Sequence, residues 1–145
     1  MNKNNPYNAY KETSIKTASR GKLVLMLYDG AVKQIDIAHD LLEKKSKQYD
    51  KINNSIIKAQ DIVTELMVSL DFEKGGEIAK NLFSLYMFFN QQLVQANINK
   101  DAELLKKIRD MLAELRETWV EVFNKIGKDN TSGGMGGVNI ADRKS

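Results

Sequence analysis

The sequence holds few residues that could carry out catalysis, and its only histidine, His39, is the first to consider. Asp36 lies three residues before His39, so the two side chains would share one face of a helix, like the Glu-x-x-His pairs of di-iron bundles. Such a centre needs two of these pairs from two helices, together with further inward-facing carboxylates. One histidine cannot supply them. The sequence therefore predicts a solvent-facing histidine rather than a metal ligand.

Other kinds of reactive site are also missing from the pattern. Cysteine is absent, which excludes disulfides, thiolate ligands and cysteine nucleophiles. The glycine-rich stretch 133–137 lacks the Lys-Ser/Thr pair and the flanking strand and helix of a phosphate-binding loop. Serine, histidine and aspartate occur, but nothing in a single sequence places them together. We expect no enzymatic activity and no cofactor. Phosphotransfer at His39 stays open as an alternative, although the residues that follow it fit such a site poorly.

Composition is typical of one globular domain. Of the 145 residues, 42% are apolar and 28% are charged, which is far from the values of disordered or membrane proteins. The net charge of +3 comes from interspersed basic and acidic residues, which favours a solvated surface over nucleic-acid binding. No apolar run approaches the length of a membrane span, and the first residues lack a signal-peptide core. We expect a cytoplasmic protein that does not insert into membranes.

Apolar residues recur at helical spacing after the single proline, Pro6. The pattern predicts four helices, over residues 19–44, 50–70, 77–97 and 101–126. Ser19 is a suitable N-cap for the first helix, and Gly30 inside it indicates the close approach of another helix. The Gly75-Gly76 pair predicts a short loop between the second and third helices.

The apolar positions define a seam on each helix. The second helix alternates spacings of four and three residues, which is typical of a heptad repeat, through Ile52, Ile56, Ala59, Val63, Leu66 and Leu70. The third is expected to bury Ile78, Leu82, Leu85, Phe89 and Ala96, with an interruption at Gln92. The fourth is expected to bury Leu105, Ile108, Leu112, Leu115, Trp119, Val122 and Ile126.

Long helices joined by short loops pack antiparallel to their neighbours. The predicted fold class is therefore all-α: an antiparallel up-down four-helix bundle formed by residues 19–126. Residues 1–18 form a polar N-terminal arm that carries Tyr7 and Tyr10. Residues 127–145 form a Gly-rich tail that is expected to be flexible, because it has too little apolar surface to order itself.

The predicted helices carry more apolar surface than a bundle core requires. Surplus surface of this kind usually marks a binding groove or a subunit contact. The candidate track comprises Ile57, Met67, Phe83, Met87, Met111 and Phe123. An irregular core could also absorb these side chains, or the N-terminal arm could lie over them. We hypothesise that Tyr7 and Tyr10 plug the groove when it is empty.

A series of short motifs runs in order through about residues 5–123. They are Asn5-Pro6-Tyr7-Asn8-Ala9-Tyr10, Thr17-Ala18-Ser19, Leu25-Met26-Leu27-Tyr28-Asp29-Gly30-Ala31, Ala59-Gln60-Asp61-Ile62, Glu65-Leu66, Ala79-Lys80-Asn81-Leu82, Leu85-Tyr86, Ala96-Asn97-Ile98, Lys100-Asp101 and Leu115-Arg116-Glu117-Thr118-Trp119. This ordered set resembles the flagellar export chaperones of the FliS family. The family is similar in architecture, an antiparallel helical bundle whose N-terminal segment caps an apolar site. Tyr7 and Tyr10 match that capping arm, whereas the Gly-rich tail departs from the family.

The resemblance implies a binding function. Members of the family bind the disordered C-terminal segment of flagellin, prevent its premature polymerisation and help deliver it to the membrane export gate. A disordered segment that folds on binding loses conformational entropy, so it needs a long apolar track on its chaperone. The surplus apolar surface agrees with that requirement. The alternatives that stay open are a self-associating structural bundle, whose surplus surface forms a homodimer, and phosphotransfer at His39.

Overall fold

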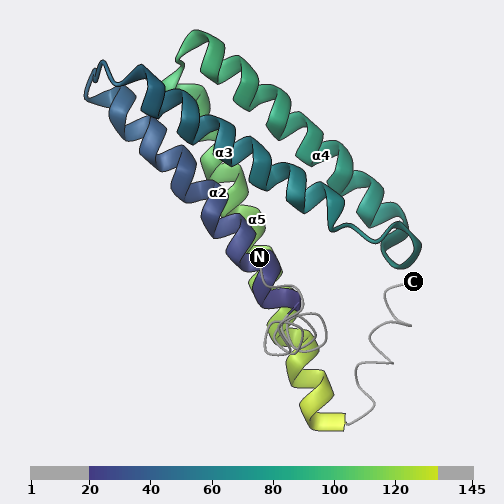
Figure 1. Ribbon diagram of the computed structural model, residues 1–145. Helices are drawn as coiled ribbons and strands as arrows, with labels where there is room; N and C mark the ends of the chain where they lie inside the picture. The colour runs from purple at the N-terminus through teal and green to yellow at the C-terminus, as the bar shows by residue number, and fades with distance from the viewer. Residues whose placement is uncertain (1–19, 134–145) are drawn as a thin grey trace, which may run out of the picture.

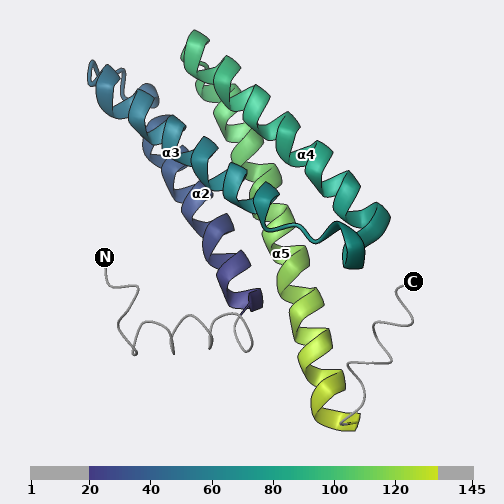
Figure 2. The same ribbon diagram turned by 45° about the vertical axis from the view of Figure 1, so that its right-hand side comes forward.

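Within residues 20–133, four long helices alternate in direction and lie side by side (Figures 1 and 2). The computed structural model describes the backbone of residues 20–133 and the side chains of residues 20–126. The helices are α2 (Arg20–Glu43), α3 (Tyr49–Val68), α4 (Phe72–Asn99) and α5 (Ala102–Gly133). The predicted all-α fold and its four packed helices are confirmed. The predicted cap Ser19 and the arm with Tyr7 and Tyr10 lie outside the described residues.

The core forms where the helices meet in a ring, with α3 between α2 and α4, and α5 closing the ring against both α2 and α4. The heptad seam predicted for α3 is buried from Ile52 to Leu66, because its spacing keeps one stripe facing the neighbouring helices. A Cβ atom at Gly30 would lie 3.2 Å from Cδ1 of Ile62. This contact confirms the predicted close approach of another helix at Gly30.

Two helices end in a way that the sequence pattern does not reveal. Lys45, after α2, and Lys100, after α4, adopt left-handed backbone conformations with φ of 56° and 50°, where glycine is the usual residue. The Lys100 ammonium donates hydrogen bonds to Oδ1 of Asn53 at 2.6 Å and to the backbone oxygen of Asn97 at 2.7 Å. Lys100 therefore joins α4 to α3 at this end of the bundle.

The connection between α3 and α4 differs from the predicted loop. The Asp71 carboxylate accepts a hydrogen bond from the Lys74 backbone N–H at 3.0 Å and starts a helical turn at Phe72. The break falls at Gly76, whose φ of 50° and ψ of −125° suit a residue without a Cβ atom. The helix therefore begins before the predicted residue 77, because Asp71 caps an additional turn and Gly76 then bends it.

The predicted seam of α4 was wrong in phase over its first half. The buried residues are Ala79, Tyr86, Phe89, Leu93 and Ala96. Ile78 is 56% exposed, and Leu85 is only partly buried. The interruption expected at Gln92 disappears because Leu93 occupies the seam. The prediction assigned Ile78 to the core because its side chain is larger and more apolar than that of Ala79. It placed Tyr86 next to the buried stripe instead of within it. Tyr86 turns inward because its hydroxyl finds a buried partner in Tyr28.

Helix α5 is longer than predicted and projects past the other helices (Figures 1 and 2). The first half of its seam, with Leu105, Ile108 and Leu112, is fully buried, whereas Val122 is 37% exposed. The helix continues beyond the predicted end at Ile126 to Gly133. The first part of the predicted tail is thus helical backbone, and residues 134–145 lie outside the described residues.

Candidate functional site

An apolar groove of about 430 Å³ lies at the end of the bundle where α2 and α4 begin and α3 ends. Helix α5 runs past this end and forms the remaining wall. The lining side chains are mostly apolar, with a few polar residues around them. They are Arg20, Gly21, Val24, Leu66, Ser69, Leu70, Asp71, Lys74, Gly75, Ile78, Ala79, Leu82, Tyr86, Trp119 and Phe123.

The groove exists because the helices are unequal in length. Helix α3 ends at Val68, and the Ser69 hydroxyl donates a hydrogen bond to the Leu66 carbonyl at 2.8 Å. Such a side-chain bond competes with further helical bonding. Helix α5 continues at the same level, so Trp119 and Phe123 are only partly covered. Three helix ends that do not close over one another, beside the continuing α5, leave an apolar hollow instead of a filled core.

Stacked aromatic rings form the α5 wall of the groove. The Trp119 and Phe123 rings lie with centroids 5.3 Å apart and planes 21° from parallel. A Cβ atom at Gly21 would be only 3.0 Å from Cγ of Phe123. The glycine therefore lets the first turn of α2 lie directly against this ring. The wall is a rigid, wide apolar surface of the kind that is enriched at binding sites.

Trp119 also belongs to a hydrogen-bonded group of three aromatic side chains from three helices, in which Tyr28 and Tyr86 are buried. The Trp119 indole N–H donates a hydrogen bond to the Tyr28 hydroxyl at 3.0 Å. The Tyr28 and Tyr86 hydroxyl oxygens are 2.5 Å apart. Burial raises the pKa of Tyr28 well above its usual range and also raises the pKa of Tyr86. Both hydroxyls thus stay neutral at physiological pH and keep their protons for hydrogen bonding.

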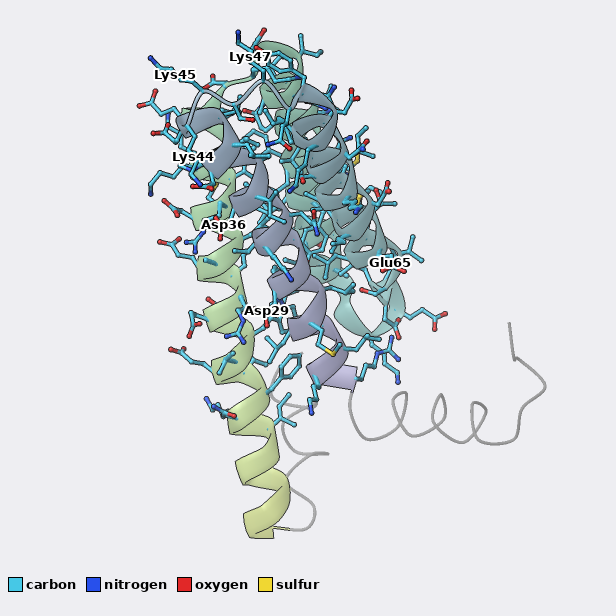
Figure 3. All side chains as sticks on the ribbon, turned by 60° about the vertical axis from the view of Figure 1, so that its left-hand side comes forward. Asp29, Asp36, Lys44, Lys45, Lys47 and Glu65 are labelled. Carbon is cyan, nitrogen blue, oxygen red and sulfur yellow. The ribbon has the colours of Figure 1, made fainter. Side chains whose placement is uncertain are left out.

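Two ion pairs hold α2 against α5 beside this group (Figure 3). Arg116 donates to Asp29 at 2.6 Å and Arg109 donates to Asp36 at 3.0 Å. The aspartates raise the pKa of each guanidinium. All four side chains are substantially exposed, so solvent screening leaves each pair with little effect on stability. They fix the register of the two helices more than they stabilise the fold.

One residue of the predicted track, Phe123, lines this groove. Met67 and Met111 are partly buried and pack against the core. Phe83 is also partly buried, and its ring meets the edge of Phe72 with centroids 5.8 Å apart. None of these three side chains lines the groove.

The two remaining track residues lie elsewhere on the surface. Met87 is 42% exposed on α4, and Ile57 is 47% exposed on α3. Ile57 lines a separate, more polar hollow between α3 and α4, together with Val94 and Ile98. The structure therefore does not bring the six predicted residues together on one surface.

Several groove residues were predicted from the sequence to lie in the core. Leu66, Leu70, Leu82 and Trp119 all belong to predicted seams, and each does pack on the core while also lining the groove. Heptad phase shows which face of a helix points inward, but not where neighbouring helices end. The sequence did contain one signal for the groove, which is Asp71, the N-cap residue of α4. A helix N-cap at residue 71 implies that α3 has already ended before it.

The residues first considered for catalysis are not arranged for it. Asp36 binds Arg109, and the nearest acidic group to His39 is the Glu43 carboxylate at 4.0 Å. The His39 side chain is only 29% exposed, less than the solvent-facing position expected. Among the described residues, no three His, Asp or Glu side chains gather as a metal site. None of the helices within residues 20–133 has the length and apolar character to cross a membrane.

Comparison with known proteins adds independent information. A family model described as "Flagellar protein FliS" matches residues 3–126. The chain is similar to the flagellar secretion chaperone FliS of Bacillus subtilis, with 34% identity over 134 residues that cover 92% of this chain and 96% of that protein. The FliS of Salmonella typhimurium is 35% identical over 117 residues, covering 79% and 84%. The FliS of Vibrio cholerae is 33% identical over 121 residues, covering 79% and 85%.

Proposed function

Because this chain belongs to the FliS family of flagellar secretion chaperones, we propose that its apolar groove holds the disordered C-terminal segment of flagellin before export. Membership confirms the family predicted from the motifs and makes the chain a chaperone rather than an enzyme. The observation that carries the proposal is the groove itself, which places the Trp119–Phe123 stack beside apolar side chains of α2, α3 and α4.

The groove suits an amphipathic helix. Helix-in-groove recognition uses apolar side chains on successive turns of the ligand, and α5 offers such a ligand an aromatic wall. Burial of each large side chain contributes about 1.5–3 kcal/mol. Ordering a disordered segment costs part of that gain, so binding remains reversible. Release of the cargo then needs no chemical step.

The same binding explains why flagellin would stay unassembled. A segment whose apolar face lies in the groove cannot present that face to another flagellin subunit. We place this complex in the cytoplasm and propose that the chaperone then brings its cargo to the membrane export gate. Both steps agree with a bundle that, within the described residues, has no membrane-spanning helix.

The N-terminal arm is proposed to compete for the groove. The described chain begins at Arg20, which itself lines the groove. An arm tethered at the rim has a high effective concentration there, so even a weak contact of Tyr7 and Tyr10 would oppose cargo binding. The arm would then cover apolar surface in the empty chaperone and yield to flagellin.

A titration with a peptide from the C-terminal segment of the host's flagellin tests the main proposal. We expect the helical circular dichroism signal to rise on mixing, with a Kd no weaker than some tens of micromolar, or roughly −6 kcal/mol. A scrambled peptide of the same composition keeps the charge but loses the apolar periodicity, and it is expected not to bind. Equal binding of the two peptides, or no binding of either, refutes the proposal.

A self-associating bundle is the second candidate, and exposed apolar side chains favour it. Ile98 is 69% exposed and Val94 is 42% exposed on α4, with Ile57 nearby on α3. Sedimentation equilibrium without any added peptide tests it. A mass that rises with concentration supports a homodimer, and a constant monomer mass removes this candidate.

A further inference from the structure

Tyr28 stands apart from the other residues near the groove because it is fully buried and does not line it. We infer that Tyr28 is a positioning residue, whose hydroxyl holds the Trp119 indole in the orientation that the cargo helix meets. The inference rests on the proposed function, since it concerns the affinity of the same groove for flagellin. It assigns a role to a side chain that the cargo never touches.

The hydrogen bond from Trp119 to Tyr28 fixes the orientation of the indole in the aromatic wall. The indole has a single polar group, its N–H, and that group donates to the Tyr28 hydroxyl at 3.0 Å. On its other side the ring stacks on Phe123. Stacking alone allows a ring to turn and slide in its own plane, whereas a hydrogen bond is directional. The bond to Tyr28 therefore fixes which edge of Trp119 faces the groove.

The indole N–H also lies near the Tyr86 hydroxyl, which is itself bonded to the Tyr28 hydroxyl. The Tyr28 hydroxyl accepts from Trp119 and also pairs with the Tyr86 hydroxyl at 2.5 Å. Without the Tyr28 hydroxyl, both Trp119 and Tyr86 lose a partner. A buried donor without an acceptor is costly, so the indole would turn toward Tyr86 or toward solvent. Either movement changes the groove wall.

The position of Tyr28 is itself held by the neighbouring ion pair. Asp29, the next residue on α2, binds Arg116, which lies one turn before Trp119 on α5. The two contacts join the same turns of α2 and α5. A groove that is shaped before cargo arrives loses less free energy on binding than one that must be ordered.

The central experiment is a double-mutant cycle on peptide affinity. Tyr28→Phe keeps the ring and removes only the hydroxyl, and we expect it to weaken the Kd of the flagellin peptide about tenfold. Trp119→Phe also weakens binding because it removes part of the wall. In the Trp119→Phe background, Tyr28→Phe is expected to weaken binding less than about twofold further, since no indole remains to be positioned.

Ile52→Val is the control for a general loss of stability. Ile52 is fully buried near the opposite end of α3 from the groove, so this variant lowers the melting temperature without altering the groove. Its peptide affinity is expected to match that of the unsubstituted protein. Equal weakening by Tyr28→Phe in both backgrounds, or no weakening at all, overturns the inference.

Trp119 is the only tryptophan, and its indole N–H gives a second, independent readout. In nitrogen-correlated NMR spectra of the unsubstituted full chain, we expect this proton to exchange slowly with water, and in Tyr28→Phe to exchange faster. Fast exchange in the unsubstituted protein refutes the inference even if Tyr28→Phe does not fold. Failure of the unsubstituted protein to bind peptide refutes the proposed function instead, so the two failures are distinguishable.

Discussion

Ile78 offers the sharpest test of where cargo binds, because it lines the groove and is nevertheless 56% exposed. Full burial of an isoleucine side chain contributes about 1.5–3 kcal/mol. Covering its exposed 56% with cargo therefore contributes roughly 0.8–1.7 kcal/mol. Since alanine keeps the β-carbon, one of the four side-chain carbons, Ile78→Ala is expected to weaken the Kd of the flagellin peptide about threefold to eightfold.

Ile98→Ala is a matched control for that measurement. Ile98 is the same residue type on the same helix, 69% exposed, but it lies at the other end of α4 and outside the groove. The two substitutions change helix propensity equally. Isothermal titration calorimetry should show a change of less than about twofold for Ile98→Ala. Equal losses for the two variants, or a larger loss for Ile98→Ala, would refute the groove and place cargo on the hollow that contains Ile57.

Three further predictions concern the arm, the buried tyrosines and the helix break. Replacing both Tyr7 and Tyr10 with alanine should tighten peptide binding and increase the fluorescence of a dye that reports exposed apolar surface; no change in either signal counts against a capping arm. Burial raises the pKa of Tyr28 and Tyr86 above the value of about 10 in an unfolded chain, so folding stability is fully present below pH 10 and falls as pH rises further. Urea titrations at pH 8 and pH 11 measure this fall, and equal stability at the two values contradicts it. Gly76→Ala should lower the free energy of unfolding by about 1–3 kcal/mol, because alanine is strained at the positive φ of this position. An unchanged urea midpoint would contradict this, since it would mean that the backbone at residue 76 adopts another conformation without cost.

Periodicity alone predicted most of the fold. The seam of α3 is buried as expected from Ile52 to Leu66, because an apolar residue at every third or fourth position there meets a neighbouring helix. The seam of α4 was placed wrongly because the prediction assigned the larger apolar side chains to the core. Ile78 is larger and more apolar than Ala79, but Ala79 is the residue that faces the core. A polar aromatic such as Tyr86 enters the core only when its hydroxyl has a partner, and that partner, Tyr28, lies on another helix.

The groove was less predictable than the fold. A groove at the end of a bundle depends on where neighbouring helices begin and end, and here local bonds set those positions, such as the Asp71 cap of α4 and the Ser69 hydroxyl bond at the end of α3. Such bonds are difficult to predict from sequence, because many residues of the same types make no cap. Surplus apolar residues predicted a binding surface, but they did not show where it lies, and Met67 and Met111 pack against the core outside the groove. Only Phe123 of the predicted track lines the groove.

The motifs that carried the family resemblance have a physical meaning that periodicity could not supply. Tyr28 and Asp29 lie on α2, and Arg116 and Trp119 lie on α5, yet they meet as a hydrogen bond and an ion pair. Neither Asp29 nor Arg116, nor the hydroxyl of Tyr28, is required to make a helix amphipathic. Since the bundle could pack with apolar residues in place of Tyr28, its hydroxyl is best explained by the directional bond that it makes to Trp119. The seams thus specify the bundle, whereas the paired motifs specify the shape of its open end, where the cargo is proposed to bind.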